Sequence, residues 1–135
     1  MNPESLMQAA RDVAKCAYAP YSHFTVGAAV LTRQGHVYCA CNVENVSYGL
    51  TSCAERNAIF KAISEGEREF VAIALAAPTC VTPCGACRQV LQEFATGELK
   101  VYMTTLEEAQ FVTTTLAQLL PNAFHFEDNP LPKTL

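Results

Sequence analysis

Two short segments, Ser52-Cys53-Ala54-Glu55-Arg56 and Pro83-Cys84-Gly85-Ala86-Cys87, set the positions from which the rest of the chain can be placed. Each is expected to begin a helix, because Ser52 is a suitable N-cap and Thr82 followed by Pro83 supplies a cap and a first helical residue. Backbone amides and the positive dipole end at a helix N-terminus favour the thiolate, the form of cysteine that binds metal. We therefore predict one zinc site with three ligands: Cys53, Cys84 and Cys87.

Three thiolates leave one position of a tetrahedral zinc open, as in catalytic sites, whereas structural sites usually have four protein ligands. The acid Glu55 stands beside that opening in the sequence. Cys-Ala-Glu followed by Pro-Cys-x-x-Cys is typical of zinc deaminases, in which the glutamate moves protons and does not bind the metal. Arg56 follows Cys53 by three residues on the same helix face, so we expect its guanidinium to donate to thiolate sulfur and offset its charge.

Each motif also has a purely structural interpretation. The Cys-x-x-Cys pair could be a redox pair, or half of a closed zinc site with Cys80 or Cys41 as fourth ligand. Ser52 and Glu55 fit a capping box, and Arg56 could form a surface salt bridge of little energetic value. Taken jointly the motifs favour a catalytic site, because a closed site has no use for an acid beside its metal.

Length and composition indicate a single domain, residues 1–135, with one sizeable core, since half of the residues are hydrophobic. The net charge is −4 and the basic residues are scattered, which argues against a nucleic-acid partner. Seven cysteines, an odd number, fit a reducing compartment better than a disulfide framework. Neither a leader segment nor an apolar run of membrane-spanning length is evident, so we expect a cytoplasmic protein with no membrane partner.

Hydrophobic periodicity and turn residues predict an α/β chain. Helices are expected over 3–17, from Cys53 to near Gly66, over 83–95 and over 116–120, and strands over 25–32, 36–41, 70–77, 99–104 and 111–114. The first two strands should form a hairpin, and the third and fourth should be parallel across a right-handed crossover. The fifth should return antiparallel, because the link 105–110 is too short for another crossover. Residues 129–135 are expected to fray.

Six segments of the chain, taken together, resemble the small homotetrameric cytidine deaminases. They are Tyr18-Ala-Pro-Tyr-Ser22, Phe24-Thr-Val-Gly-Ala28, Cys41-Asn-Val-Glu-Asn45, Cys53-Ala-Glu-Arg56, Pro83-Cys-Gly-Ala-Cys-Arg-Gln89 and Pro121-Asn-Ala-Phe124. The resemblance implies a three-layer α-β-α fold with a mixed five-stranded sheet and one Zn²⁺ per subunit. It also implies hydrolytic deamination of cytidine and deoxycytidine to the uridines with release of ammonia, a step of pyrimidine salvage.

The resemblance further assigns roles to individual residues. Cys53, Cys84 and Cys87 match zinc ligands, Glu55 a proton shuttle and Arg56 a donor to the thiolates. The substrate contacts that it implies are Phe24 on the nucleoside, Asn42 and Glu44 on the ribose hydroxyls, the Ala54 amide on the pyrimidine carbonyl, and Tyr48 and Phe124 reaching a neighbouring subunit's site in a homotetramer.

Without the resemblance, simpler interpretations stand beside these roles. Phe24 could belong to the core, Asn42 to a turn, Glu44 to a solvated surface and Phe124 to a helix-end staple. Asn42 and Glu44 are two apart, so in extended chain both side chains point the same way. The remaining cysteines are most simply buried thiols: Cys16, Cys39, Cys41 and Cys80.

Overall fold

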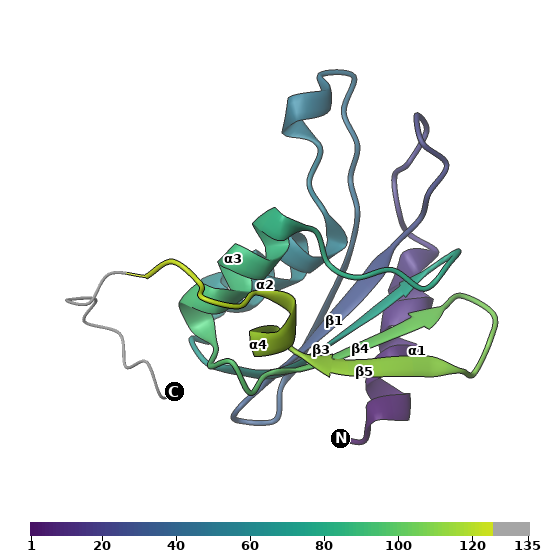
Figure 1. Cartoon of the computed structure of the whole chain (residues 1–135). Helices are drawn as coiled ribbons and strands as arrows, with labels where there is room; N and C mark the ends of the chain where they lie inside the picture. The colour runs from purple at the N-terminus through teal and green to yellow at the C-terminus, as the bar shows by residue number, and fades with distance from the viewer. Residues whose placement is uncertain (126–135) are drawn as a thin grey trace.

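A mixed five-stranded sheet separates two layers of helices in the computed structural model, which describes residues 1–125 (Figure 1). The strand order is β2-β1-β3-β4-β5. The strands are β1 (Gly27–Thr32), β2 (Val37–Cys41), β3 (Phe70–Ala77), β4 (Lys100–Thr105) and β5 (Phe111–Thr115). Strands β3 and β4 pair in parallel, and the other neighbouring strands of the sheet pair antiparallel. The predicted α/β fold with three layers and a mixed sheet is confirmed.

Helix α1 (Pro3–Ala14) covers one face of the sheet, and the other helices cover the opposite face (Figure 1). Those helices are α2 (Ala54–Ser64), α3 (Gly85–Phe94) and the short α4 (Leu116–Leu119). Alternate residues of a strand point to opposite faces. On β3, Ile73 and Leu75 therefore join the core beneath α2 and α3, whereas Ala74 and Ala76 join the core beneath α1.

Small residues allow α1 to lie close to the sheet. A Cβ atom added at Gly27 would lie 1.9 Å from the carbonyl oxygen of Ala10, so no larger residue fits there without moving the helix. Asn2 caps α1, accepting a hydrogen bond from the Ser5 amide at 2.8 Å. The helix ends at Ala14, three residues earlier than expected, because residues 15–17 tighten into i→i+3 turns, after which the Tyr18 amide donates to the Asn42 carbonyl just past β2.

The predicted hairpin and the predicted helix end near Gly66 are both present, and at each a glycine supplies positive φ: Gly35 (φ 92°) between β1 and β2, and Gly66 (φ 99°) after α2. Strand β5 returns antiparallel to β4, as its short link requires. Among residues 1–125, no helix combines the length and apolar character needed to cross a membrane. The segment 129–135, expected to fray, lies outside the described residues.

Candidate active site

Three cysteine sulfurs meet where α2 and α3 begin. Cys53 and Cys84 are the N-cap residues of these helices, and Cys87 lies in the first turn of α3. The three Sγ atoms lie within 4.8 Å of one another, at 3.9 Å for Cys53–Cys84 and 3.4 Å for Cys84–Cys87. Sulfur ligands at the usual zinc–sulfur distance in a tetrahedron would be about 3.8 Å apart. The cluster therefore fits a Zn²⁺ ion, with small adjustments of the side chains.

The predicted caps of these two helices are wrong. Ser52 does not cap α2, since its hydroxyl donates to Asn57 Oδ1 at 2.6 Å, and Thr82 does not cap α3, since its oxygen accepts from Arg88 at 2.9 Å. Pro83 precedes α3 instead of opening it. The capping-box interpretation of Ser52 and Glu55 falls with this result. The cysteines themselves take the cap positions, which puts two of the sulfurs at the positive helix ends.

Positive charge and hydrogen bonds stabilise the ionised form of one ligand. Hydrogen bonding with Cys87, and then with Arg56, lowers the pKa of Cys53 to about 5. The same contact raises the pKa of Cys87, because its proton is shared with the Cys53 sulfur. Arg56 Nη2 lies 3.4 Å from Cys53 Sγ, and the buried Nε of Arg56 has no hydrogen-bond partner within residues 1–125. A guanidinium that contacts the Cys53 sulfur and lies near the other two suits a site that carries excess negative charge.

Glu55 is buried beside the sulfurs, with 5% of its surface exposed. Burial raises its pKa to about 7, so it can hold or release a proton near neutral pH. Residues two apart on a regular helix do not face each other. Here Cys53 is the extended N-cap (φ −69°, ψ 151°) and Glu55 is in the first turn, so both line one cavity.

That cavity has a volume of about 300 Å³ and also receives side chains from the segments just before β1 and just after β2. Phe24, Asn42 and Glu44 line it together with Cys53, Ala54, Glu55 and Cys84. Its volume is at the lower end of the range usual for small-molecule sites. The structure thus places residues of segments far apart in the sequence around a single space.

Asn42 and Glu44 are both buried, while Val43 between them is 47% exposed. Asn42 donates to the Phe24 carbonyl at 2.8 Å and accepts from the Val26 amide at 2.9 Å, so it links the strand ends across the cavity wall. Glu44 accepts hydrogen bonds from the Ser22 hydroxyl and from two backbone amides. The Ser22 hydroxyl is the main cause that lowers the pKa of Glu44, which keeps the carboxylate ionised. Glu44 is therefore an ionised carboxylate fixed by three hydrogen bonds and not a solvated surface charge.

Tyr48 and Phe124 do not line this cavity in their own chain. Tyr48 belongs to the 3₁₀ turn η1 (Tyr48–Leu50), which stands away from the sheet (Figure 1), and its side chain is 75% exposed. Its ring meets that of Tyr21 edge to face at 5.9 Å. Phe124 is 68% exposed near the end of the described chain. Phe24 is half-buried and packs on the core beneath α2 and α3, so it serves both the core and the cavity wall.

Three residues that hold the site together had no predicted role. Ser22 binds Glu44 as described above. Asn57 donates to the Cys41 carbonyl at 2.8 Å, which ties α2 to the end of β2. Arg88 donates to the carbonyls of Pro83 and Leu119, both at 2.7 Å, and so joins the metal-binding loop to α4. Ser22 and Arg88 stand inside the motifs quoted above, but only the folded partners reveal what they bind.

The other cysteines lie outside the metal cluster. Cys16 and Cys80 are exposed, and Cys39 and Cys41 are half-buried, so the prediction of buried thiols is wrong for the first pair. All seven cysteines lie in the described part of the chain and none forms a disulfide. Neither Cys41 nor Cys80 joins the three-sulfur group, and the Cys80 thiol donates to the Met103 carbonyl at 3.5 Å. The structure therefore offers no fourth sulfur for a closed site.

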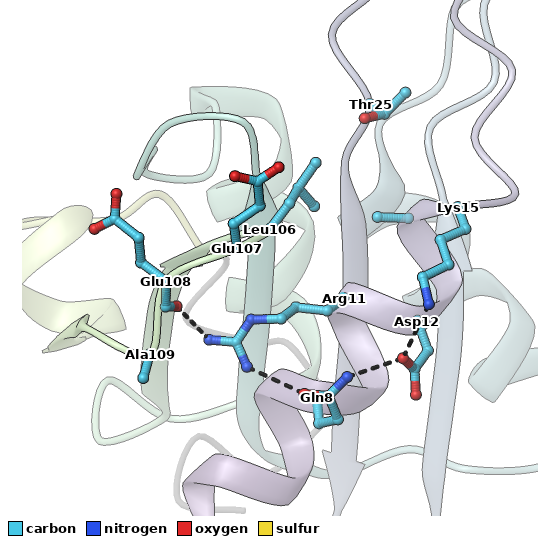
Figure 2. Close-up of a pocket in the computed structure, with 10 residues that line it drawn as sticks. Gln8, Arg11, Asp12, Lys15, Thr25, Leu106, Glu107, Glu108 and Ala109 are labelled. Carbon is cyan, nitrogen blue, oxygen red and sulfur yellow. Dashed lines mark hydrogen bonds and ion pairs between the residues drawn. The ribbon is translucent and has the colours of Figure 1, made fainter.

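A larger cavity of about 500 Å³ lies on the opposite face of the sheet, between α1 and the β4–β5 connection (Figure 2). Arg11 crosses it and donates to the Thr105 and Glu108 carbonyls at 3.0 and 2.8 Å, while Lys15 pairs with Asp12. These bonds anchor α1 to the loop. The cysteines and Glu55 are absent from its lining, so this space is not part of the candidate active site.

Three cysteines at two helix N-termini, with a buried glutamate beside them on a three-layer α-β-α fold, define a zinc-dependent deaminase. Residues 1–103 match the family model described as "Cytidine and deoxycytidylate deaminase zinc-binding region". The chain belongs to this family of cytidine and deoxycytidylate deaminases. Its cofactor is Zn²⁺, one ion per chain.

Several named proteins are similar to this chain over nearly its whole length. The cytidine deaminases of Sporosarcina psychrophila and Halalkalibacterium halodurans are each 49% identical over 130 residues, covering 95% of this chain and 95% and 98% of their own. The crystal structure of cytidine deaminase from Burkholderia pseudomallei aligns with a TM-score of 0.85 at 45% identity, covering 92% of this chain and 100% of that one. The enzyme from Mycobacterium tuberculosis aligns at 0.82 and 40% identity, covering 93% and 99%.

Proposed function

We propose that this chain catalyses the hydrolytic deamination of cytidine and deoxycytidine to uridine and deoxyuridine, with release of ammonia. The observation that carries the proposal is the buried Glu55, which shares one cavity with two of the three clustered cysteines. The names of relatives at 49% identity support the substrate. Pyrimidine salvage in the cytoplasm is the corresponding cellular role.

Cys53, Cys84 and Cys87 would hold the zinc ion. When bound, Zn²⁺ supplies the Lewis acid that makes water nucleophilic near neutral pH. Arg56 offsets the charge of the thiolates through its bond to Cys53. This contact is expected to keep Cys53 in the thiolate form, which binds zinc, at the pH where the enzyme works.

Glu55 moves the protons. Its carboxylate accepts a proton from the water that attacks C4 of the cytosine ring, and the protonated carboxyl donates to the neutral ring nitrogen N3. After the C4–oxygen bond has formed, Glu55 takes the remaining proton from the C4 hydroxyl and carries it to the amino nitrogen; the C4–nitrogen bond then breaks to release ammonia as the C4–oxygen bond becomes the carbonyl of the product. A carboxyl group with a pKa of about 7 suits both directions of transfer.

The cavity wall supplies contacts for the rest of the nucleoside. The Ala54 amide lies in the first turn of α2, where backbone N–H groups have no helical acceptor, and it would donate to the pyrimidine carbonyl. Phe24 would pack on the nucleoside, and Asn42 and Glu44 would bind the ribose hydroxyls. The burial of both polar side chains beside the cavity supports this role.

The chain is further proposed to act as a homotetramer in which neighbouring subunits complete each site. Tyr48 and Phe124 are large, exposed side chains that do not line the cavity of their own chain. Exposed aromatic residues of this kind are suited to a subunit interface. They would therefore reach the site of a neighbour.

An ultraviolet absorbance assay with cytidine and deoxycytidine tests the proposal on zinc-replete protein. Loss of the cytosine absorbance with stoichiometric ammonia is the expected result. Zinc-loaded, folded protein that converts neither nucleoside would refute the proposal. A single-stranded polydeoxycytidine substrate serves as a comparison, and turnover of that polymer without turnover of nucleosides would point to an editing enzyme.

A further inference from the structure

Backbone hydrogen bonds join the segment 18–22 to the segment that carries Glu44. The Tyr18 amide donates to the Asn42 carbonyl at 3.0 Å, and the Glu44 amide donates to the Tyr18 carbonyl at 2.8 Å. The chain then turns through Pro20, with the His23 amide donating to the Ala19 carbonyl at 2.9 Å and His23 at φ 57°. In this turn the backbone amides of Tyr21 and Ser22 point toward the same position.

The Glu44 carboxylate occupies that position. Its Oε1 atom accepts from the Tyr21 and Ser22 amides at 2.9 and 3.1 Å, which uses both lone-pair directions of that oxygen. Its Oε2 atom accepts from the Ser22 hydroxyl. Within residues 1–125 this is the one bond to Oε2, so Oε2 keeps the capacity for a further donor. Glu44 and Ser22 also both line the cavity that contains Glu55.

The Ser22 hydroxyl has a second partner. While it donates to Glu44, it accepts a hydrogen bond from the Phe24 amide at 3.0 Å. Serine and threonine can make both bonds with one short side chain, whereas alanine can make neither. The Ser22 hydroxyl thus connects Glu44 and Phe24, two residues that line the cavity. Without this hydroxyl, Oε2 of Glu44 would lose the hydrogen bond that fixes its orientation.

We propose that Ser22 is a positioning residue for sugar recognition: its hydroxyl orients Glu44 so that Oε2 presents its remaining lone pair to a nucleoside hydroxyl. The inference rests on the proposed function, in which Glu44 binds the ribose. Ser22 itself is not required to touch the substrate. Its effect should therefore appear in substrate affinity and depend on the presence of the sugar hydroxyls.

The test compares Ser22→Ala with Ser22→Thr on two ligands, cytidine and 2′,3′-dideoxycytidine, the second measured as a substrate or as a competitive inhibitor. For Ser22→Ala, KM for cytidine should rise about tenfold with kcat within about twofold, the loss of one hydrogen bond to a charged group. The affinity for dideoxycytidine should change less than about twofold. Ser22→Thr should restore the affinity for cytidine.

Equal weakening of both ligands by Ser22→Ala would overturn the proposal, because the hydroxyl would then serve the fold or Phe24 alone. An unchanged KM for cytidine would also overturn it. If Ser22→Ala does not fold, Ser22→Cys replaces it, since a thiol is a weaker donor and should give a smaller loss that is still confined to cytidine.

A Glu44→Gln variant distinguishes failure of the role inferred for Ser22 from failure of the proposed ribose contact of Glu44. If wild-type protein converts cytidine and Glu44→Gln weakens both ligands equally or neither, the proposed ribose contact has failed. If Glu44→Gln weakens cytidine alone and Ser22→Ala does not, only the role of Ser22 has failed. Adding Ser22→Ala to Glu44→Gln should produce no further loss, because the carboxylate that Ser22 orients is already gone.

Discussion

Nη2 of Arg56 lies 3.4 Å from Sγ of Cys53, and the two residues belong to the same turn at the start of α2. Arg56 raises the acidity of that thiol, second only to hydrogen bonding by Cys87 among the causes that lower its pKa. Thiolate, not thiol, binds zinc, and protons compete with the metal for each sulfur. The contact therefore connects a single guanidinium to the pH range over which the site can hold zinc.

Replacing Arg56 should shift zinc retention toward higher pH. Arg56 lowers the pKa of Cys53, so its removal in Arg56→Gln raises that pKa and lets protons displace the metal at a pH where the unaltered protein keeps it. Zinc release followed with a chromophoric chelator during acid titration measures the midpoint. Arg56→Lys, which keeps the charge, should lie between the two, and coincident midpoints for all three proteins would contradict this role.

Glu55→Gln should abolish most turnover without loss of zinc. Glu55 is proposed to move protons, and such transfers contribute about 10²- to 10⁴-fold each, so a fall of several powers of ten is expected. Zinc content and far-ultraviolet circular dichroism should match the unaltered protein. Glu65→Gln, at the exposed C-cap of the same helix, is the matched control and should remain active. Near-normal turnover of Glu55→Gln would leave this carboxyl group without a catalytic role.

The same substitution should stabilise the metal-free protein, and only above acid pH. Burial raises the pKa of Glu55 from 4.5 to about 7, so the unfolded chain ionises first and the folded state loses stability as pH rises above 4.5. The cost is fully developed above pH 7 and corresponds to about 3 kcal/mol. Below the unfolded value both states bind the proton and the cost vanishes.

Urea unfolding in the presence of chelator and reductant can measure this difference. Glu55→Gln should unfold at higher urea than the unaltered protein at pH 8, and the gap should close by about pH 4. A gain of equal size at both pH values would mean that shape, and not ionisation, accounts for it. The expected result would mean that Glu55 contributes to activity at a cost in the stability of the metal-free protein.

Two cysteine substitutions should separate a three-sulfur site from a closed one. Cys80 lies outside the sulfur cluster, so Cys80→Ser should keep metal and activity, whereas Cys84→Ser should lose both. Substitution with cobalt makes the ligand set visible, because the intensity of sulfur-to-metal charge transfer follows the number of thiolates. A spectrum of three sulfurs that is unchanged by Cys80→Ser is expected. Loss of one sulfur on Cys80→Ser would restore the structural-site interpretation.

The order of elements and the antiparallel return of β5 could be predicted because they follow from local pattern and link length. The first residues of α2 and α3 could not be predicted, because Ser52 and Thr82 are both residue types that favour N-cap positions. Only the fold shows that their side chains bond to Asn57 and Arg88 instead. The same limit applies to Ser22, whose acceptor Glu44 is 22 residues away. Short-range propensity ranks candidate residues, but long-range hydrogen bonds decide between them.

Phe124 provides a test of assembly. Its ring is 68% exposed, and its carbonyl accepts a hydrogen bond from Gln89 on α3 at 3.2 Å, so the segment after Pro121 is fixed to the helix that carries Cys84 and Cys87. An exposed aromatic side chain on an anchored segment gains more from a partner's surface than from water. If a neighbour's site receives it, Glu55 and Phe124 of one working site come from different chains.

Co-expression of Glu55→Gln with Phe124→Ala should then recover activity, after size measurement has established that the protein is oligomeric. With equal expression and random assembly, about one quarter of the sites would combine an intact Glu55 with an intact Phe124 from another chain. Those sites should be fully active, so the mixture should exceed the average of the two parents, provided that Phe124→Ala alone is impaired. Separately purified parents mixed without exchange of subunits are the control. A co-expressed preparation no more active than that control would mean that Phe124 serves only its own chain.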